Sequence, residues 1–401
     1  MIGKKNRLVG ATLLVSGTTI GAGMLALPVT TGLAGIIPSL IVMTAIWLFM
    51  MLTAFYLLEV NLRVKEESNL ILMIHMTLGR PGEVVAWIVY LLLLYSLTAS
   101  YMVGCSQILR DFLNQLVFLE IPEWVGPVSI FVIFAVLVYF GTQVVDFLNR
   151  FFMFGLVVAY VGIVGFGCCK AAPEMWSYFD WKFLLPSVSV VLTTFGYHII
   201  IPTLTTYLEH DSRLLKKAIF IGSLIPYVVY VLWQLVVMGV VPVYGEYSLT
   251  EAAQQGIQVT FFLQALLANP WVGVAVRLFA FFAMITSLLG VSLSLSDFLA
   301  DGLKIKKTHL GKSFIVLLTF VPPLLFALFY PQGFILALKY AGICVVIILA
   351  ILPCLMAWFE RYGPETERSF IKTDFRVIGG KAGIIFALVV SFILLGIEVF
   401  T

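Results

Sequence analysis

The chain of 401 residues is 61% hydrophobic and 11% charged, with a formal net charge of +3. Soluble domains have roughly 25% charged residues, so this composition excludes an ordinary soluble protein and indicates an integral membrane protein. No polar stretch is long enough to form a separate soluble domain. We therefore expect residues 1–401 to form a single domain in the lipid bilayer, and the basic residues form no patch that suits a nucleic acid.

The first charge-free run is residues 8–58, which contain no Asp, Glu, Lys, Arg or His. Because a helix needs about 20 apolar residues to cross the hydrocarbon core, this run predicts two spans. The first span contains Gly17, Gly21, Gly23 and Pro28, which weaken the backbone hydrogen bonds in its middle. Backbone groups freed at membrane depth are tolerated only where they line a cavity inside the protein. We therefore expect a broken helix that borders a transporter's substrate site.

Further charge-poor runs follow, and the whole set predicts an all-α membrane protein with eleven transmembrane helices. The sixth run is broken at its centre by Gly196 and Pro202 and contains His198, the only histidine within the runs. The eleven runs lie near residues 8–32, 36–60, 84–114, 124–141, 146–167, 183–207, 217–241, 270–299, 313–330, 334–358 and 379–400.

The two broken helices are five spans apart. Because five is odd, a repeat of five spans must begin its second copy from the opposite face of the membrane. Broken helices at corresponding positions of two inverted halves are typical of secondary transporters. We expect one repeat over about 8–167, a second over about 183–358, and an extra helix at about 379–400.

The distribution of basic residues predicts the orientation. With the amino terminus in the cytoplasm, 19 of the 24 Lys and Arg residues fall in cytoplasmic segments, and such an asymmetry fixes topology. The segments 300–312 and 360–381 should then face the cytoplasm, 242–269 should face outside, and the carboxyl terminus should lie outside. The five cysteines have no metal-type spacing, and their odd number does not suggest a disulfide framework.

The glycine break in the first span suits an anion. Where a helix restarts, its first N–H groups lack intrahelical partners and its dipole end is positive, so residues from Thr19 to Gly23, with Ile20, Gly21 and Ala22 between them, are candidates to bind a substrate carboxylate. Packing glycines are the alternative. Carbonyl groups near Thr194 and Gly196 would complement a substrate ammonium.

Aromatic and titratable residues lie at or near the second break. Phe195, Tyr197 and Tyr101 are candidates to flank an aromatic substrate side chain, although aromatic residues in such a chain more often face lipid or core. His198 titrates near neutral pH when unperturbed, so it is a candidate proton carrier or substrate ligand, and the alternative is a neutral histidine that caps a freed carbonyl.

Three stretches carry a resemblance to a known family. These are Gly17 to Pro28, Thr77 to Gly82, and Phe195 to His198 followed by Pro202 to Leu204. Together they resemble the bacterial tryptophan/tyrosine permease family, which belongs to the amino acid, polyamine and organocation superfamily. The resemblance runs through nearly the whole chain and looks closest to the tyrosine-specific members. It implies the leucine-transporter-type fold, an aromatic amino-acid substrate, a bacterial inner-membrane location and symport with protons.

The resemblance also implies a second kind of ion site. The segment Phe282 to Gly290 is similar to the sodium-site segment of leucine-transporter-type proteins. The implied oxygen ligands are the carbonyls of Gly17, Ile20 and Ala283 and the hydroxyls of Thr286 and Ser287. Serine and threonine in membrane helices more often bond back to the preceding turn. Proton-coupled relatives often have a lysine in the fifth span, yet residues 151–167 contain none, so proton coupling is favoured only slightly over sodium.

The charged residues near span ends have plainer expectations. We expect Glu59 and Glu398 to extend toward the membrane surface, as side chains near span ends usually do. Arg277 is a candidate outer gate, and Asp297 and Asp301, four residues apart on one helix face, are candidates for an inner gate. Extension of these side chains into solvent is the favoured expectation for all three, with the gates as the alternative.

Other functional classes find less support in the sequence. An intramembrane enzyme would need a catalytic set within the spans, and the chain has no His-Glu-x-x-His or Gly-x-Ser-x-Gly motif. A channel would need a ring of repeated filter residues. Without an ATP-binding motif, transport must be driven by an ion gradient, exchange or facilitated flux, and no cofactor beyond a coupling ion, H⁺ or Na⁺, is expected. The exact amino acid, the stoichiometry and the oligomeric state stay open.

Overall fold

The computed structural model describes residues 4–64, 69–117, 120–140, 142–267, 269–306, 308–363 and 375–400. These residues are helical apart from loops, short turns and an isolated bridge between Gly35 and Phe179. The all-helical prediction is therefore confirmed. Within the predicted cytoplasmic segments, Lys307 and residues 364–374 lie outside the described ranges.

The helices follow the predicted runs closely, because long stretches of apolar residues dictate helix in a membrane. Those of the amino-terminal half are α1 (Lys4–Thr19), α2 (Gly23–Thr31), α3 (Ile36–Arg63), α4 (Leu70–Val117), α5 (Val125–Phe140), α6 (Thr142–Cys168), α7 (Val188–Thr194) and α8 (Ile201–Tyr207). Those of the carboxyl-terminal half are α9 (Ser212–Val240), α10 (Leu249–Gln255), α11 (Thr260–Leu267), α12 (Pro270–Gly302), α13 (His309–Phe329), α14 (Phe334–Val345), α15 (Leu352–Tyr362) and α16 (Gly380–Phe400).

Both predicted breaks are present. Helices α1 and α2 meet at an angle of 55° across the break at residues 20–22. The sixth span is divided into α7, a 3₁₀ turn at Tyr197–Ile200 (η5) and α8, with Gly196 at the junction (φ −81°, ψ 43°). Glycine lacks the side chain that stiffens a helix, and Pro202 provides no N–H to continue the first half.

Two further irregularities shape the bundle. In α4, Gly79 has a left-handed φ of 72°, so a kink separates residues 70–78 from the long helix that follows. Helix α14 passes into α15 through a π-helix at Val346–Ile351 (η6), which ends two residues before Pro353. Because proline has no N–H to donate to the preceding turn, the backbone there must rearrange its hydrogen bonds.

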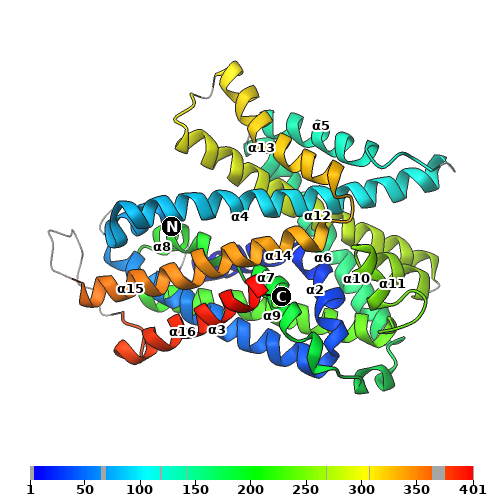
Figure 1. Cartoon of the computed structure of the whole chain (residues 1–401), viewed down its shortest axis with the longest axis horizontal. Coiled ribbons are helices and arrows are strands. Elements are labelled where there is room, and N and C mark those ends of the chain that lie inside the picture. Colours follow the sequence, from blue (N-terminus) through cyan, green and yellow to red (C-terminus); the bar gives the residue numbers. More distant parts are fainter. Residues whose placement is uncertain are drawn as a thin grey trace.

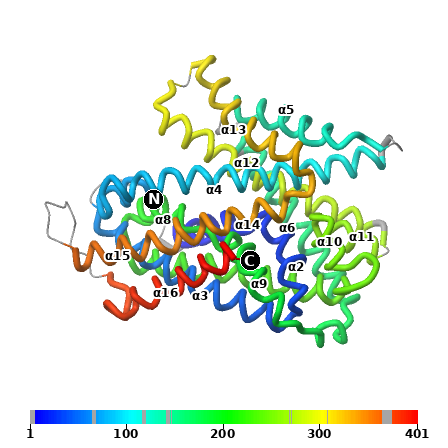
Figure 2. The backbone as a smooth tube through the Cα atoms, in the orientation of Figure 1, coloured from blue at the N-terminus to red at the C-terminus, as the bar shows by residue number. Residues whose placement is uncertain are grey.

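The broken helices lie in the centre of the molecule. Helix α1 packs on α9, and α2 packs on both α7 and α9. Figure 2 shows the blue α2 close to the green α7 and α9, beside the end of the orange α14. Helix α4 packs on α12, α13 and α14, and α5 and α13 lie together beyond it (Figure 1). On α6, Phe147 and Phe154 are more than 70% exposed in the isolated chain, as expected for side chains that face lipid.

Fewer helices are long enough to cross a membrane than the eleven spans that the sequence predicts. In the described residues, nine helices or helix runs are long and apolar enough to cross a membrane, and the bent pair α1 and α2 gives a tenth. The predicted fourth span corresponds to α5, whose 16 residues extend about 24 Å at 1.5 Å per residue. This length falls short of the roughly 30 Å of a hydrocarbon core, so helix length does not establish an eleventh span.

The predicted orientation leads to a labelling test. Figure 1 places α10 and α11 at one end of the long axis and α8 and α15 at the other. We expect a membrane-impermeant thiol reagent to label Glu246→Cys in intact cells, because this exposed residue precedes α10, and not Leu310→Cys, which is 86% exposed at the start of α13.

The labelling background must lack Cys168 and Cys169, since both thiols are exposed. Serine at these two positions serves as the background, and labelling after cell lysis confirms that each introduced cysteine is reactive. Labelling of Leu310→Cys alone in intact cells would reverse the orientation.

Candidate functional site

A polar cavity of about 560 Å³ lies where the two broken helices meet. Its wall comes from α1, the break, α4, α6, the second break and α12. The lining residues are Leu13, Leu14, Gly17, Thr18, Thr19, Ile20, Gly21, Gly23, Tyr90, Leu93, Leu94, Leu97, Tyr101, Asn149, Met153, Thr193, Thr194, Gly196, Tyr197, Ile199, Ile200, Thr203, Thr286, Ser287, Gly290, Val291 and Ser294. An apolar cavity of about 680 Å³ lies elsewhere, between α4, α5, α6, α11 and α12.

Most of the predicted site residues border the polar cavity, although they come from distant parts of the sequence. Those in its wall are Gly17, Thr19, Ile20, Gly21, Gly23, Tyr101, Thr194, Gly196, Tyr197, Thr286 and Ser287. The predicted residues that do not border it are Ala22, Phe195, His198 and Ala283. The sequence reasoning missed the aromatic ring of Tyr90 and the amide of Asn149, which carried no motif.

The first break leaves two backbone donors free. The Ala22 N–H donates to the Ser287 hydroxyl at 2.8 Å, and the Met24 and Leu25 N–H groups bond within the first turn of α2. Among the described hydrogen bonds, none uses the N–H of Gly21 or Gly23. Because both residues border the cavity, an anion there meets two amide donors at the positive end of α2.

Small residues allow the two breaks to approach. A Cβ atom on Gly23 would lie 2.8 Å from the Thr194 methyl group at the end of α7, and one on Gly21 would lie 2.5 Å from the Ser287 hydroxyl. Both distances are shorter than a van der Waals contact. Glycine at these positions is therefore required by the close packing of α2 on α7 and α12.

Helix α9 ties the two breaks together. The Tyr230 hydroxyl donates to the Thr19 carbonyl at 2.6 Å and lies 3.3 Å from the Thr194 carbonyl. One buried phenol thus donates to the last carbonyl of α1, which the helix itself leaves open, and lies within reach of the last carbonyl of α7. The Trp233 indole N–H, one turn further along α9, donates to the Met24 carbonyl at 2.9 Å.

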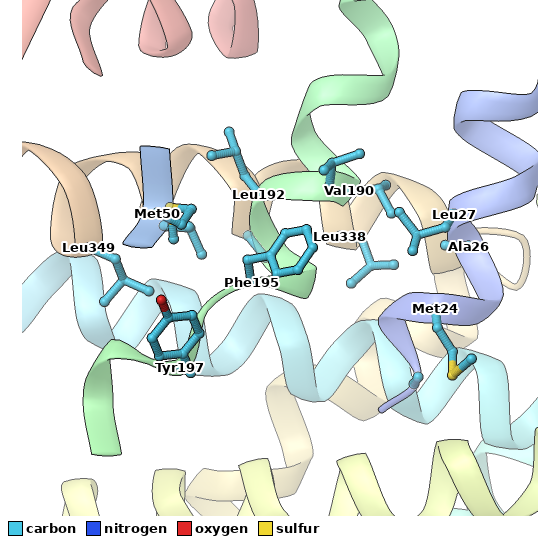
Figure 3. Close-up of a cluster of buried hydrophobic side chains, with 14 of the residues drawn as sticks. Met24, Ala26, Leu27, Met50, Val190, Leu192, Phe195, Tyr197, Leu338 and Leu349 are labelled. Carbon is cyan, nitrogen blue, oxygen red and sulfur yellow. The ribbon is translucent and has the colours of Figure 1, made fainter. Parts of the chain in front are cut away.

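The two aromatic residues of the second break are both buried in the apolar core. Phe195 is fully buried, and its ring packs edge-on against Tyr230 with centroids 5.5 Å apart. Figure 3 shows this ring among Val190, Leu192 and Leu338, within the apolar core. Tyr197 is 1% exposed and lies in the same cluster, near Met50 and Leu349, but it also borders the cavity, as do Tyr101 and Tyr90 of α4.

His198 is fully buried and directed toward α3. Its Nε2 lies 2.9 Å from the Thr53 hydroxyl, which itself donates to the Met50 carbonyl at 3.1 Å. The ring therefore donates its Nε2 proton to Thr53, and Nδ1 has no hydrogen-bond partner among the described residues. The histidine lies behind the break and outside the cavity wall, so it is not placed to touch a ligand in that cavity.

The predicted cation ligands form only part of a shell. Ser287 already accepts the Ala22 N–H, and Thr286 donates to the carbonyls of its own helix at Phe282 (2.8 Å) and Ala283 (3.2 Å). Oxygen lone pairs remain on both hydroxyls, which suits a hard cation. No cluster of His, Cys, Asp or Glu side chains that suits a metal ion occurs in the described ranges.

The cavity extends from the breaks toward one end of the molecule. Its wall includes Leu13 and Leu14 before the first break and Ser294 near the end of α12. On the other side of the breaks, Met24 and Leu25 are fully buried. The site is thus closed toward α10 and α11 and extends toward the end that holds the amino terminus.

The predicted gate residues occupy different places. Arg277 borders the apolar cavity and donates to the Gln115 amide oxygen of α4. Asp297 is partly buried, and Asp301 is exposed near the end of α12. None of the three borders the polar cavity.

Two charged residues near span ends depart from expectation. Glu59 is fully buried in an ion pair with Arg361, and Glu398 is 2% exposed against α7 and α14. The expectation that both side chains extend toward the membrane surface is wrong, because helices distant in sequence enclose them.

Comparisons with known proteins agree with this geometry. The sequence model of the tryptophan/tyrosine permease family matches residues 4–398. The chain is 32% identical to the "Tyrosine-specific transport system 1" of Haemophilus influenzae, over 98% of this chain and 96% of that protein. It is 31% identical to the "Tryptophan-specific transport protein" of the same organism, over 94% and 92% of the two chains.

The structure is similar to that of MhsT in complex with L-phenylalanine, with a TM-score of 0.68 and 15% sequence identity. The alignment covers 98% of this chain and 97% of MhsT. This likeness identifies the leucine-transporter-type fold, as predicted. With the match of the family along almost the entire sequence, it follows that the chain is a multi-pass membrane protein of the tryptophan/tyrosine permease family, a family of transporters rather than enzymes.

Proposed function

We propose that this protein imports an aromatic L-amino acid, with L-tyrosine as the favoured substrate, by ion-coupled symport and alternating access. The observation that carries the proposal is the polar cavity bordered by both helix breaks. Relatives described as tyrosine-specific and tryptophan-specific support an aromatic substrate. The transporter operates in the bacterial inner membrane with its amino terminus in the cytoplasm.

The cavity has groups for each part of an amino acid. The substrate carboxylate accepts hydrogen bonds from the Gly21 and Gly23 N–H groups, because these donors have no partner among the described residues and belong to residues that border the cavity. The ammonium group lies at the carboxyl end of α7 near Thr194 and Gly196, where the helix dipole is negative. The aromatic side chain packs among the rings that border the cavity.

Coupling to a proton is favoured over coupling to sodium. Symport with protons is what the resemblance of the sequence implies, and the Ser287 hydroxyl is already engaged by the Ala22 N–H. The alternative is a sodium-coupled transporter of another neutral amino acid. It is supported by the hydroxyls of Thr286 and Ser287, which border the cavity beside the Gly17 and Ile20 backbone.

A substrate screen in proteoliposomes tests the proposal. We expect labelled L-tyrosine to enter, and unlabelled L-tyrosine, L-tryptophan and L-phenylalanine to compete better than L-leucine or L-serine, because the cavity wall offers aromatic partners. Liposomes without protein measure leakage. Uptake of aliphatic or hydroxy amino acids without competition by any aromatic one would refute the assignment.

A further inference from the structure

Helix α16 contains one acidic residue, Glu398, which is 2% exposed although it lies two residues before the end of the helix. A buried carboxyl group within a membrane domain is costly, and such groups are commonly part of ion or proton pathways. The cavity that we assign to the amino acid does not include this residue. It therefore needs an explanation of its own.

The surroundings of Glu398 form a site on two other helices. The Ser189 hydroxyl of α7 donates to Oε2 of Glu398. A Cβ atom on Gly342 of α14 would lie 2.8 Å from the same oxygen, so the carboxyl group packs directly on the Gly342 backbone. The second oxygen, Oε1, has no hydrogen-bond partner among the described residues. This oxygen is thus available to bind a proton.

The charged groups around this site are few. Lys339 of α14, three residues before Gly342, is close enough to Glu398 for electrostatic attraction. The same helix carries Cys344 and the mostly exposed Tyr340, whereas α7 and the neighbouring turns Leu185–Ser187 and η6 contain no ionisable side chain. The acidic and basic groups of α3 and α15, such as Glu59 and Arg361, gather near Val377 before the opposite end of α16.

A single short helix, α7, connects the surroundings of Glu398 to the substrate cavity. Helix α7 begins at Val188 and ends at Thr194, which borders the cavity. Ser189 and Thr194 are separated by five residues of helix, or about 7.5 Å. A change in the bond between Glu398 and Ser189 therefore acts on the helix end that receives the substrate.

We propose that Glu398 is the proton-binding group that couples transport to a pH gradient, a proposal that rests on the transport function above. The carboxylate accepts one proton and becomes a neutral carboxylic acid, and the same proton leaves on the other side of the membrane with one substrate molecule. The ionised form accepts the Ser189 hydroxyl and attracts Lys339, whereas the neutral form loses the attraction. Alternating access requires that α7 take up two conformations. If the bond between Ser189 and Glu398 is present in only one of them, the proton affinity of Glu398 differs between the two, which is the requirement for coupling.

The test compares wild-type protein with Glu398→Gln in proteoliposomes that contain the pH-sensitive dye pyranine. In the wild type, external L-tyrosine should carry protons inward, and an inward pH gradient should drive accumulation. In the variant, proton influx with L-tyrosine and accumulation driven by the pH gradient should both fall by about tenfold or more. L-tyrosine counterflow should stay within about twofold of the wild type, because exchange between loaded states needs no release of the proton. Glu123→Gln is the matched control, since its side chain is 63% exposed in a surface pair with Arg110.

Several outcomes overturn the inference while leaving the transport function intact. These are normal pH-driven accumulation by Glu398→Gln, or wild-type L-tyrosine uptake that responds to a sodium gradient and moves no protons. Absence of counterflow with any aromatic amino acid in the wild type refutes the transport function and the inference with it. If Glu398→Gln also loses counterflow, Ser189→Ala decides: a changed pH dependence of uptake supports the site, and an unchanged one refutes it.

Discussion

Replacement of Glu59 by Gln is expected to lower the free energy of unfolding by about 3–5 kcal/mol, the cost of leaving a buried charge without its partner. The side chains of Glu59 and Arg361 are both fully buried. Arg361 donates from Nε to Oε1 at 2.7 Å and from Nη2 to Oε2 at 2.5 Å, and the Val377 N–H donates to Oε2 at 2.8 Å. Glutamine retains the shape and removes the negative charge, so Arg361 loses the carboxylate that pairs with it and keeps only neutral contacts such as the Val377 carbonyl.

Unfolding of purified protein in detergent, followed by heat or by a denaturant titration, measures this loss. Glu209→Gln removes a carboxylate from an exposed pair with Arg7, where the Glu209 side chain is 71% exposed, and should change stability by less than about 1 kcal/mol. Combining Glu59→Gln with Arg361→Gln should recover part of the loss, because no uncompensated charge remains. Equal stability of Glu59→Gln and Glu209→Gln would show that the buried pair contributes no more to the free energy of unfolding than the exposed pair does.

Replacement of Gly23 by Val should reduce the rate of uptake by about 100-fold, as misplacement of binding groups by about 1 Å can do. A Cβ atom here lies 2.8 Å from the Thr194 methyl group. Threonine is branched at Cβ and cannot rotate away freely, so α2 and α7 must separate. The Gly23 and Gly21 donors and the end of α7 then no longer face one substrate at the same time.

Initial rates of L-tyrosine uptake, normalised to the amount of folded protein that elutes in one peak by size exclusion, provide the measurement. Gly162→Val is the control, because a Cβ atom at Gly162 meets nothing within 4 Å. It should transport at a rate close to that of the wild type. A similar rate for Gly23→Val would show that the contact between the two breaks is dispensable.

The sequence predicts the breaks because Gly21, Gly23, Gly196 and Pro202 have backbone properties that are independent of the rest of the chain. The fold class follows from the spacing of these breaks. The direction of side chains beyond a break is different, since it depends on the dihedral angles within it. Phe195, with φ −109° and ψ 25°, therefore turns into the core, and His198 turns toward α3, which no periodicity indicates.

Contacts between helices that are distant in the sequence also cannot be predicted from the sequence pattern. Glu59 and Arg361 are separated by 302 positions and Ser189 and Glu398 by 209. The local sequence around Glu59 and Glu398 does not predict which residue each of them pairs with. A charged residue near a span end is usually solvated, so this interpretation was reasonable and wrong for both glutamates. The cavity residues Tyr90 and Asn149 were missed for the same reason, because only the assembled bundle brings them to the breaks.

The π-helix between α14 and α15 has a consequence for how this span can turn. A π segment holds one more residue per turn than an α-helix, so its conversion to α-helix rotates one end against the other by about 100° and shifts it by about 1.5 Å. The α15 end is fixed, because Arg361 is bonded to Glu59 of α3. Any such rotation must therefore appear at the α14 end, where Gly342 packs on Ser189. With its α15 end held, this span can change its helical register by one residue, and the change would rotate the part that packs on the first half of the sixth span.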